Sequence, residues 1–427
     1  MTTGPAEVVV DWLPRPLRRW AVAMDTPVTS FVLVASATAM LLVFGLLMVL
    51  SSSSVESFAT TGNAWAIAGR QVMFAAIGLP LLLVAARTPV RWWKRLAWPL
   101  LLGALALQAL VFVPGLGVEV NGNRNWIRVA GFTAQPSEAI KLALVVWSAA
   151  VLARKRDLLG SIGHVLVPVL FPVGALALGL VLAGRDLGTA LVIMITLAGL
   201  FFAAGTPLRY FVLGGGVAVA GVAALVLQEQ HRITRIQAWL SGDACADIYG
   251  ECWQPTHGMW ALASGGWWGL GLGASKEKWA WLPEAHNDFI FAIVGEELGL
   301  PGTLSVLLLL VALAVGMVRV AQRTTDPFVV IATTGVMVWV LGQALINIGF
   351  VIGVLPVVGV PLPLVSSGGS SLVVTMVALG MVMSFARDEP GARQALATSA
   401  RAARSGAAVV ADLRLSRARV LPARPRR

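Results

Sequence analysis

The chain has 427 residues, of which 57% are hydrophobic and 12% are charged, and its formal net charge is +11. Soluble proteins carry about 25% charged residues, so this composition excludes an ordinary soluble protein and indicates a polytopic membrane protein. The positive charge does not indicate nucleic-acid binding, because the basic residues gather in short segments between apolar runs and in residues 388–427.

Residues 1–29 form a basic leader before the first apolar run. Trp12 and Trp20 are interleaved with Arg15 and Arg18, which is typical of an interfacial helix on anionic lipid. A solvated leader that only sets topology fits equally well. The apolar run that follows is longer than the roughly 7–15 residues of a signal-peptide core, so we expect a retained span and no cleavable signal.

Ten apolar segments are each close to the ~20 residues that a bilayer core requires. The predicted spans are residues 30–50, 69–87, 97–114, 136–153, 164–183, 187–204, 210–227, 289–318, 327–346 and 371–386. Most of the 32 lysines and arginines then fall on one side, which the positive-inside rule makes cytoplasmic. The predicted fold class is an all-α polytopic membrane protein with both termini cytoplasmic. Its large extracytoplasmic loop, residues 228–288, joins the seventh and eighth spans.

The first long outer loop, residues 115–135, leads into the fourth span. Asn121 and Gly122 favour a turn with positive φ, and Arg124 and Trp126 follow it as candidate substrate-binding residues. After Pro136, which suits the first position of a helix, Glu138 and Lys141 are spaced for an i,i+3 ion pair. A lysine that deep in a span also has a reason to face a polar cavity, so both roles stay open.

The turn between the fifth and sixth spans holds Arg185 and Asp186. These two side chains can pair with each other, which makes Asp186 structural. Alternatively, Arg185 can reach an anionic substrate, because guanidinium binds phosphate oxygens in a bidentate manner.

The chain has two cysteines, Cys245 and Cys252, and both lie in the large outer loop. A disulfide between them is one prediction for an oxidising compartment, and two reduced structural cysteines are the other. Two cysteines alone are not a zinc site, because such a site usually needs four ligands.

Residues 265–299 collect charges between glycines and tryptophans, just where the chain returns to apolar sequence. Charged residues at a membrane usually mark function. The candidate substrate-binding residues here are Lys276, Lys278, Glu284 and His286. Asp288 lies at the re-entry point, where partial desolvation would raise its pKa towards that of a useful base. We therefore predict Asp288 as the general base, although a helix N-cap role is compatible with the same position.

Glu296 and Glu297 follow Asp288, and on an ideal helix Glu296 would lie about 12 Å deeper. We interpret both as structural partners of Lys141 or of an internal arginine. Residues 361–371 lack helical character, and irregular backbone at membrane depth is tolerated only where it is buried or lines a cavity. The hydroxyls and amides around Ser366, Gly368, Gly369 and Ser370 could ligate pyrophosphate, or the segment could be a re-entrant turn. Residues 388–427 are an Arg/Ala-rich tail, expected to be disordered or weakly helical and to meet anionic lipid or a protein.

Four stretches together resemble one family, the SEDS proteins of the FtsW/RodA group, over nearly all of residues 30–387. They are NGNRNWI with QPSEAIK, RDLGTA, GLGASKEKWAWLPEAHNDFIFAIVGEELGLPG, and PLPLVSSGGSSL. The central block is more similar to the division branch, FtsW, than to the elongation branch, RodA. Asn125, Ser367 and the Gly184–Arg185 pair depart from the family's pattern.

The resemblance implies a glycosyltransferase that polymerises lipid II into peptidoglycan at the outer face of the bacterial plasma membrane, at the division septum, and releases undecaprenyl diphosphate. By position, Asp288 matches the acidic residue that the family needs for polymerisation. The implied partners are lipid II, membrane lipid, a class B penicillin-binding transpeptidase and other divisome membrane proteins, with no nucleic acid. The sequence demands no cofactor and shows no metal site, although a divalent cation is compatible. A lipid II flippase, a non-catalytic scaffold for the transpeptidase and a RodA-like elongation role remain as alternatives.

Overall fold

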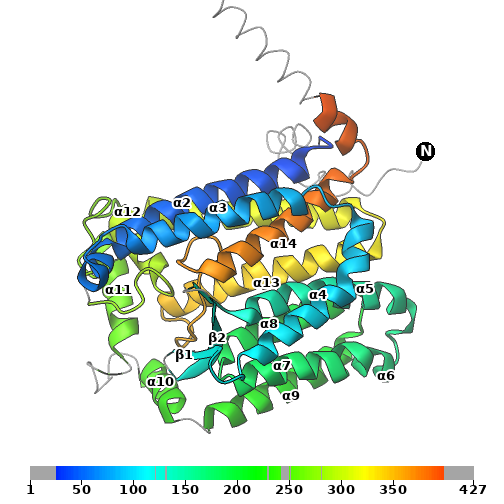
Figure 1. Cartoon of the computed structure of the whole chain (residues 1–427), viewed down its shortest axis with the longest axis horizontal. Coiled ribbons are helices and arrows are strands. Elements are labelled where there is room, and N and C mark those ends of the chain that lie inside the picture. Colours follow the sequence, from blue (N-terminus) through cyan, green and yellow to red (C-terminus); the bar gives the residue numbers. More distant parts are fainter. Residues whose placement is uncertain are drawn as a thin grey trace, which may run out of the picture.

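The computed structural model describes residues 26–120, 122–129, 132–227, 230–241, 250, 252–279 and 281–398. Its helices run roughly parallel to one another across Figure 1, which also labels the elements. Before the large loop the elements are α2 (Thr29–Thr61), α3 (Ala66–Ala85), α4 (Val90–Leu110), β1 (Gly117–Val120), β2 (Asn123–Val129), β3 (Phe132–Ala134), α5 (Pro136–Lys155), η1 (Arg156–Leu158), α6 (Ile162–Val165), η2 (Leu166–Gly174), α7 (Ala175–Ala183), α8 (Leu187–Ala203) and α9 (Leu208–Leu227). They continue with α10 (Gln230–Ser241), α11 (Trp253–Gly265), α12 (Ile290–Arg323), α13 (Pro327–Val351) and α14 (Gly369–Arg387).

Each of the ten predicted spans coincides with helical structure. Eight helices in the described residues are long and apolar enough to cross a membrane. The 17-residue α8 is shorter, and the early lysine and arginine residues of α4 lower its hydropathy. A multi-pass membrane fold is therefore confirmed, while the count of ten spans stays a prediction.

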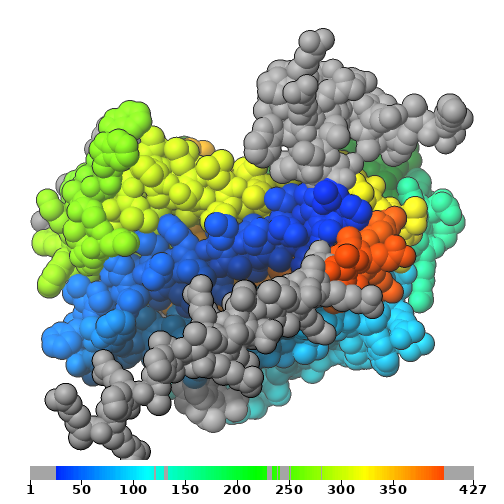
Figure 2. Space-filling model, turned by 90° about the horizontal axis from the view of Figure 1, so that it is seen from above, coloured from blue at the N-terminus to red at the C-terminus, as the bar shows by residue number. Residues whose placement is uncertain are grey.

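The interior is built from α5, α13 and α14, whose apolar residues are largely buried. Around them α3 packs on α14, α12 on α2, α4 on α5 and α8 on α13. Figure 2 shows α2 lying across one face beside α12 and α3. By contrast, α9 is peripheral and none of its residues is buried. Exposed apolar side chains on such outer helices suit contact with lipid, since the helical backbone satisfies its own polar groups.

The predicted all-α fold class is confirmed, with one small addition in the loop of residues 115–135. This loop contains a three-stranded antiparallel sheet in the order β1-β2-β3, which lies with α10 and α11 at the left-hand end of the bundle in Figure 1. In its register Val118 faces Trp126, and Ile127 faces Ala134. β-branched and aromatic residues favour a pleated surface, and Gly122 has the φ of 78° that the tight turn requires.

The predicted span of residues 289–318 is also not one continuous helix. α12 breaks at Gly299, whose φ of 63° and ψ of −156° are not helical, shortly before Pro301. A β-carbon on Gly299 would lie 2.4 Å from the backbone nitrogen of Gly269, so the loop before α12 packs directly onto the break. Glu296 precedes this break, so its depth of about 12 Å below Asp288, taken from an ideal helix, stays a prediction.

The basic end of the bundle lies opposite the sheet. The ion pairs among the described residues there include Lys94 with Asp326 at 2.7 Å and Arg323 with Glu389 at 3.1 Å. Residues 1–25 and 399–427 lie outside the described residues, so the predictions for the leader and for most of the tail are not tested. Residues 392–398 are helical.

Candidate functional site

Asp288 lies at the entrance to α12 and is held by its backbone. The side-chain amide of Asn347 in α13 donates to the Asp288 carbonyl at 2.8 Å and to the Val360 carbonyl at 2.7 Å. One buried amide thus fixes the backbone of Asp288 to the segment of residues 353–368. The carboxylate of Asp288 is half-buried, and a β-carbon on Gly359 would lie 3.4 Å from its Oδ2. The absence of a side chain at Gly359 therefore leaves space beside the carboxylate.

The turn before Asp288 is organised by the two predicted substrate-binding residues Glu284 and His286. Glu284 has a φ of 56°, and its carboxylate accepts a 2.5 Å bond from the Asn287 side chain. Its carbonyl accepts from the amides of Asn287 and Phe289. The Nδ1 of His286 lies 3.1 Å from the Glu56 carboxylate of α2. Both side chains thus have protein partners that shape the turn.

The serine-glycine segment is bonded to this same turn. Ser366 Oγ donates to the Asn287 carbonyl at 2.7 Å, and the Ser367 amide donates to the His286 carbonyl at 2.9 Å. Gln71 of α3 bridges the segment by donating to the Ser366 carbonyl and accepting from the Gly368 amide. These contacts brace the turn before Asp288. Both interpretations of the segment, contact with pyrophosphate and a re-entrant turn, remain predictions.

A second polar cluster lies where α5 and α8 begin. Lys141 forms a buried ion pair with Glu138 at 2.8 Å and donates to Gln343 at 2.9 Å. Asp186 caps α8 by accepting from the Thr189 amide, and it also accepts from the Gln135 side chain at 2.8 Å. Burial raises the pKa of Asp186, while the bonds from Thr189 oppose that shift.

This cluster is joined to the serine-glycine segment and hence to Asp288. Gln343 donates to the carbonyl of Pro361 at 2.8 Å, and the Gln135 amide donates to Ser370 Oγ at 3.0 Å. Gly369 lies against the Phe74 ring, where a β-carbon would approach a ring carbon to 2.5 Å. The polar residues at the starts of α5 and α8, those of α13 and the turn before α12 therefore belong to one connected site.

Electrostatics at Asp288 favour a base that titrates near neutrality. Burial raises the pKa of Asp288 to about 7, and the charge of Glu284 adds to that shift. Arg235 of α10 and His286 lower the pKa, and Asp186 raises it. A carboxylate with such a pKa can accept a proton near pH 7 and release it afterwards.

Arg124 and Arg185, two predicted substrate-binding cations, are brought together by the sheet. The amide of Arg124 donates to the Gly184 carbonyl at 3.0 Å, so β2 adjoins the turn between α7 and α8. Arg185 occupies the left-handed region with a φ of 66°. Asn125 is buried against Gly184, where a β-carbon would lie 1.8 Å from Asn125 Oδ1. Asn125 and Gly184, which both depart from the family's pattern, therefore pack directly against each other. Trp126 is half-buried beside them on β2.

The prediction that Glu296 and Glu297 pair with Lys141 or an internal arginine is wrong. Glu297 pairs instead with Lys278 at 3.1 Å, and it accepts a 2.5 Å bond from Ser51 Oγ. Glu296 accepts from Ser275 Oγ at 2.5 Å and from the amide of Lys276 at 2.9 Å. The break at Gly299 lets residues 266–278 fold back over the start of α12, so the nearest cation is Lys278. That lysine is only 6% exposed, whereas Lys276 is exposed.

Sequence reasoning missed most of the side chains that hold the site, namely Ser51, Gln71, Gln135, Arg235, Gln343 and Asn347. A signal existed for the amides, because a polar residue within an apolar span needs a partner. Cys252 is buried just before α11. Cys245 lies outside the described residues, so the disulfide remains a prediction. Within the described residues no three His, Cys, Asp or Glu side chains gather as metal ligands.

Comparison with known proteins gives consistent matches along the chain. The model of a family described as cell cycle proteins, FtsW/RodA/SpoVE, matches residues 32–390. The "Probable peptidoglycan glycosyltransferase FtsW" of Mycobacterium tuberculosis is 43% identical over 394 residues, which cover 92% of this chain and 75% of that protein. "Stage V sporulation protein E" of Bacillus subtilis is 35% identical over 350 residues, which cover 82% of this chain and 95% of that protein.

Solved structures agree with these relatives. A chain from a study of "polymerization and crosslinking by a peptidoglycan synthase complex" superimposes with a TM-score of 0.67 at 26% identity, over 83% of this chain and 97% of that chain. The rod shape determining protein RodA of Thermus thermophilus gives a TM-score of 0.59 at 25% identity, over 83% of this chain and 96% of that chain.

Proposed function

The chain belongs to the FtsW/RodA/SpoVE family of cell cycle proteins, and on that premise we propose that Asp288 is the general base of its glycosyltransferase reaction. The chain is a membrane peptidoglycan glycosyltransferase that acts on lipid II. The observation that supports the role of Asp288 is its position. A half-buried carboxylate with a pKa of about 7 lies beside Gly359, which has no side chain to cover it, within one connected group of polar side chains.

In the proposed reaction Asp288 accepts the proton of the 4-hydroxyl of the acceptor's GlcNAc. That oxygen attacks C1 of the donor's MurNAc with inversion. The bond from C1 to undecaprenyl diphosphate breaks, and the diphosphate leaves with the bonding electron pair. Arg124, Arg185 and Lys276 are cations on the same side of the molecule that can stabilise the departing charge. Lys278 is not assigned to this task, because its ammonium is already paired with Glu297.

We place the reaction at the outer membrane face and, from the similarity to FtsW, at the division septum. The matching chain from a peptidoglycan synthase complex supports a class B penicillin-binding protein as partner. Lipid tails would reach the site sideways between helices, which explains why a reaction between sugars uses such an apolar protein.

The proposal is tested with the full chain, purified with its cognate transpeptidase and supplied with lipid II. We expect glycan strands on a gel when the transpeptidase is blocked with a β-lactam. A parallel assay follows transfer of labelled lipid II across proteoliposome membranes. Transfer without polymerisation would favour a flippase, and neither activity would favour a scaffold.

The pH dependence of the reaction provides a further prediction. Only the carboxylate form of Asp288 accepts a proton, and burial raises its pKa to about 7. The polymerisation rate should therefore fall about tenfold per pH unit below pH 7 and level off above it. Initial rates measured from about pH 5.5 to about pH 8.5 would show this midpoint. A rate that stays constant over this whole range, as for a base at the usual aspartate value of 3.8, would contradict the raised pKa of Asp288.

A further inference from the structure

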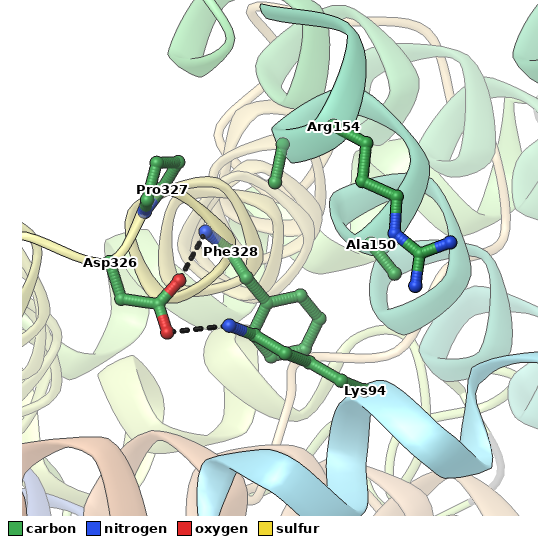
Figure 3. Close-up of a pocket in the computed structure, with 7 residues that line it drawn as sticks. Lys94, Ala150, Arg154, Asp326, Pro327 and Phe328 are labelled. Atoms are coloured by element: carbon green, nitrogen blue, oxygen red, sulfur yellow. Dashed lines mark hydrogen bonds and ion pairs between the residues drawn. The ribbon is translucent and has the colours of Figure 1, made fainter.

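We propose that a pocket at the basic end of the bundle binds the phosphate group of an anionic phospholipid. The pocket has a volume of about 210 Å³ and lies between α4, α5 and α13 (Figure 3). Its lining residues are Lys94, Ala150, Ala153, Arg154, Asp326, Pro327 and Phe328. It lies on the face opposite the Asp288 site, so it does not rest on the proposed function.

The pocket lies at the membrane depth where lipid headgroups lie. Arg154 belongs to the last turn of α5, and Asp326 is the N-cap of α13. Both helices are candidate spans, so the pocket lies where two spans end, at the depth of the membrane–water boundary. Alanine, proline and phenylalanine side chains form part of its wall, which suits the glycerol and upper acyl carbons of a phospholipid.

The charges of the pocket favour an anion. Asp326 is its one carboxylate, and both oxygens of Asp326 are occupied. Oδ1 accepts from the Phe328 amide at 3.0 Å and Oδ2 accepts from Lys94 Nζ at 2.7 Å. Lys94 keeps two further N–H donors, and its ammonium lies 5.4 Å from the centre of the Phe328 ring.

Arg154 supplies the second cation. Its guanidinium has no ion pair or hydrogen bond with any residue in the described part of the chain, and no dashed line reaches it in Figure 3. Guanidinium binds phosphate oxygens with two parallel hydrogen bonds. Basic pockets between spans on the cytoplasmic side of membrane proteins bind anionic headgroups. The neighbouring Arg91 and Arg95 on α4 extend the positive field of the same end.

The test uses the full chain in detergent with dioleoylphosphatidylglycerol as probe, and native mass spectrometry to count bound lipid. Wild type should retain this lipid in preference to dioleoylphosphatidylcholine. Arg154→Gln should weaken retention roughly tenfold, because a charge-assisted pair of bonds is lost. The matched control is Arg156→Gln, which removes an exposed arginine two residues away and should leave retention unchanged.

A second variant is expected to strengthen lipid retention, which a misfolded protein would not do. Asp326→Asn keeps an oxygen to cap α13 but removes the competing negative charge, so lipid retention should tighten about threefold. Equal loss in the Arg154 and Arg156 variants would overturn the pocket in favour of diffuse surface charge. Equal retention of the two lipids would also overturn it. Displacement by inorganic phosphate at the lipid's own concentration would assign the pocket to free phosphate instead.

Discussion

Asp288→Asn is expected to lower the rate of glycan polymerisation by roughly 10²–10⁴-fold, because a positioned general base contributes about that much. The substitution preserves the shape of the side chain and removes only its ability to accept a proton. The bond from Asn347 reaches the backbone carbonyl of Asp288, so the turn and the start of α12 should keep their positions. The loss should therefore appear in kcat, with little change in KM for lipid II.

The matched control is Asp388→Asn, which changes an exposed aspartate at the opposite end of the molecule. Asp388 pairs with Arg393 at 2.6 Å, and its loss should leave polymerisation within about twofold of wild type, since surface pairs contribute little. Both variants should copurify with the transpeptidase and melt at the wild-type temperature. A folded Asp288→Asn enzyme with wild-type kcat would remove Asp288 from the role of base.

The apolar helices and the location of Asp288 follow from simple sequence signals. A run of about twenty apolar residues usually forms either a buried helix or a membrane-spanning helix. A carboxylate at the edge of such a run is conspicuous because ionising it there is unfavourable. The strands of residues 117–134 are less apparent, because the sequence pattern indicates only the turn at Asn121 and Gly122 within an outer loop and not the strands on either side of it. The break at Gly299 was also signalled, because Gly299 and Pro301 are both helix breakers.

The neighbours of Asp288 could not be predicted from the sequence. Asn347, Gln343 and Gln71 are neutral amides in apolar helices, and nothing local indicates which distant carbonyl each one binds. Gln71 meets Ser366 across 295 residues of sequence, and Lys141 meets Gln343 across 202. Only the packing of the helices fixes such pairs. The same argument explains the error at Glu297, because Lys278 becomes its partner only once the loop before α12 packs against the first turns of that helix.

Of the substitutions considered, breaking the ion pair between Lys278 and Glu297 is expected to cause the largest loss of stability. Lys278→Met should destabilise the protein by about 3–5 kcal/mol, because the buried Glu297 side chain would then lack its cation. The Glu297 side chain is fully buried, and bonds from Ser51 and the Ser275 amide do not neutralise its charge. Thermal unfolding followed by tryptophan fluorescence measures the effect, with the exposed Lys276→Met as control, for which we expect a change within about 0.5 kcal/mol.

Replacing Glu297 as well should restore much of the stability that Lys278→Met loses. In the double variant Lys278→Met with Glu297→Gln the amide can still accept from Ser51, and no ion is left in the interior, so its melting temperature should lie above that of Lys278→Met alone. A double variant less stable than Lys278→Met would show that Glu297 contributes chiefly through its other bonds. Because this ion pair holds residues 273–278 against the helix that begins just after Asp288, Lys278→Met should also reduce polymerisation at temperatures below its unfolding transition. The distortion would then reach the base before the fold is lost, which separates a positioning effect from simple unfolding.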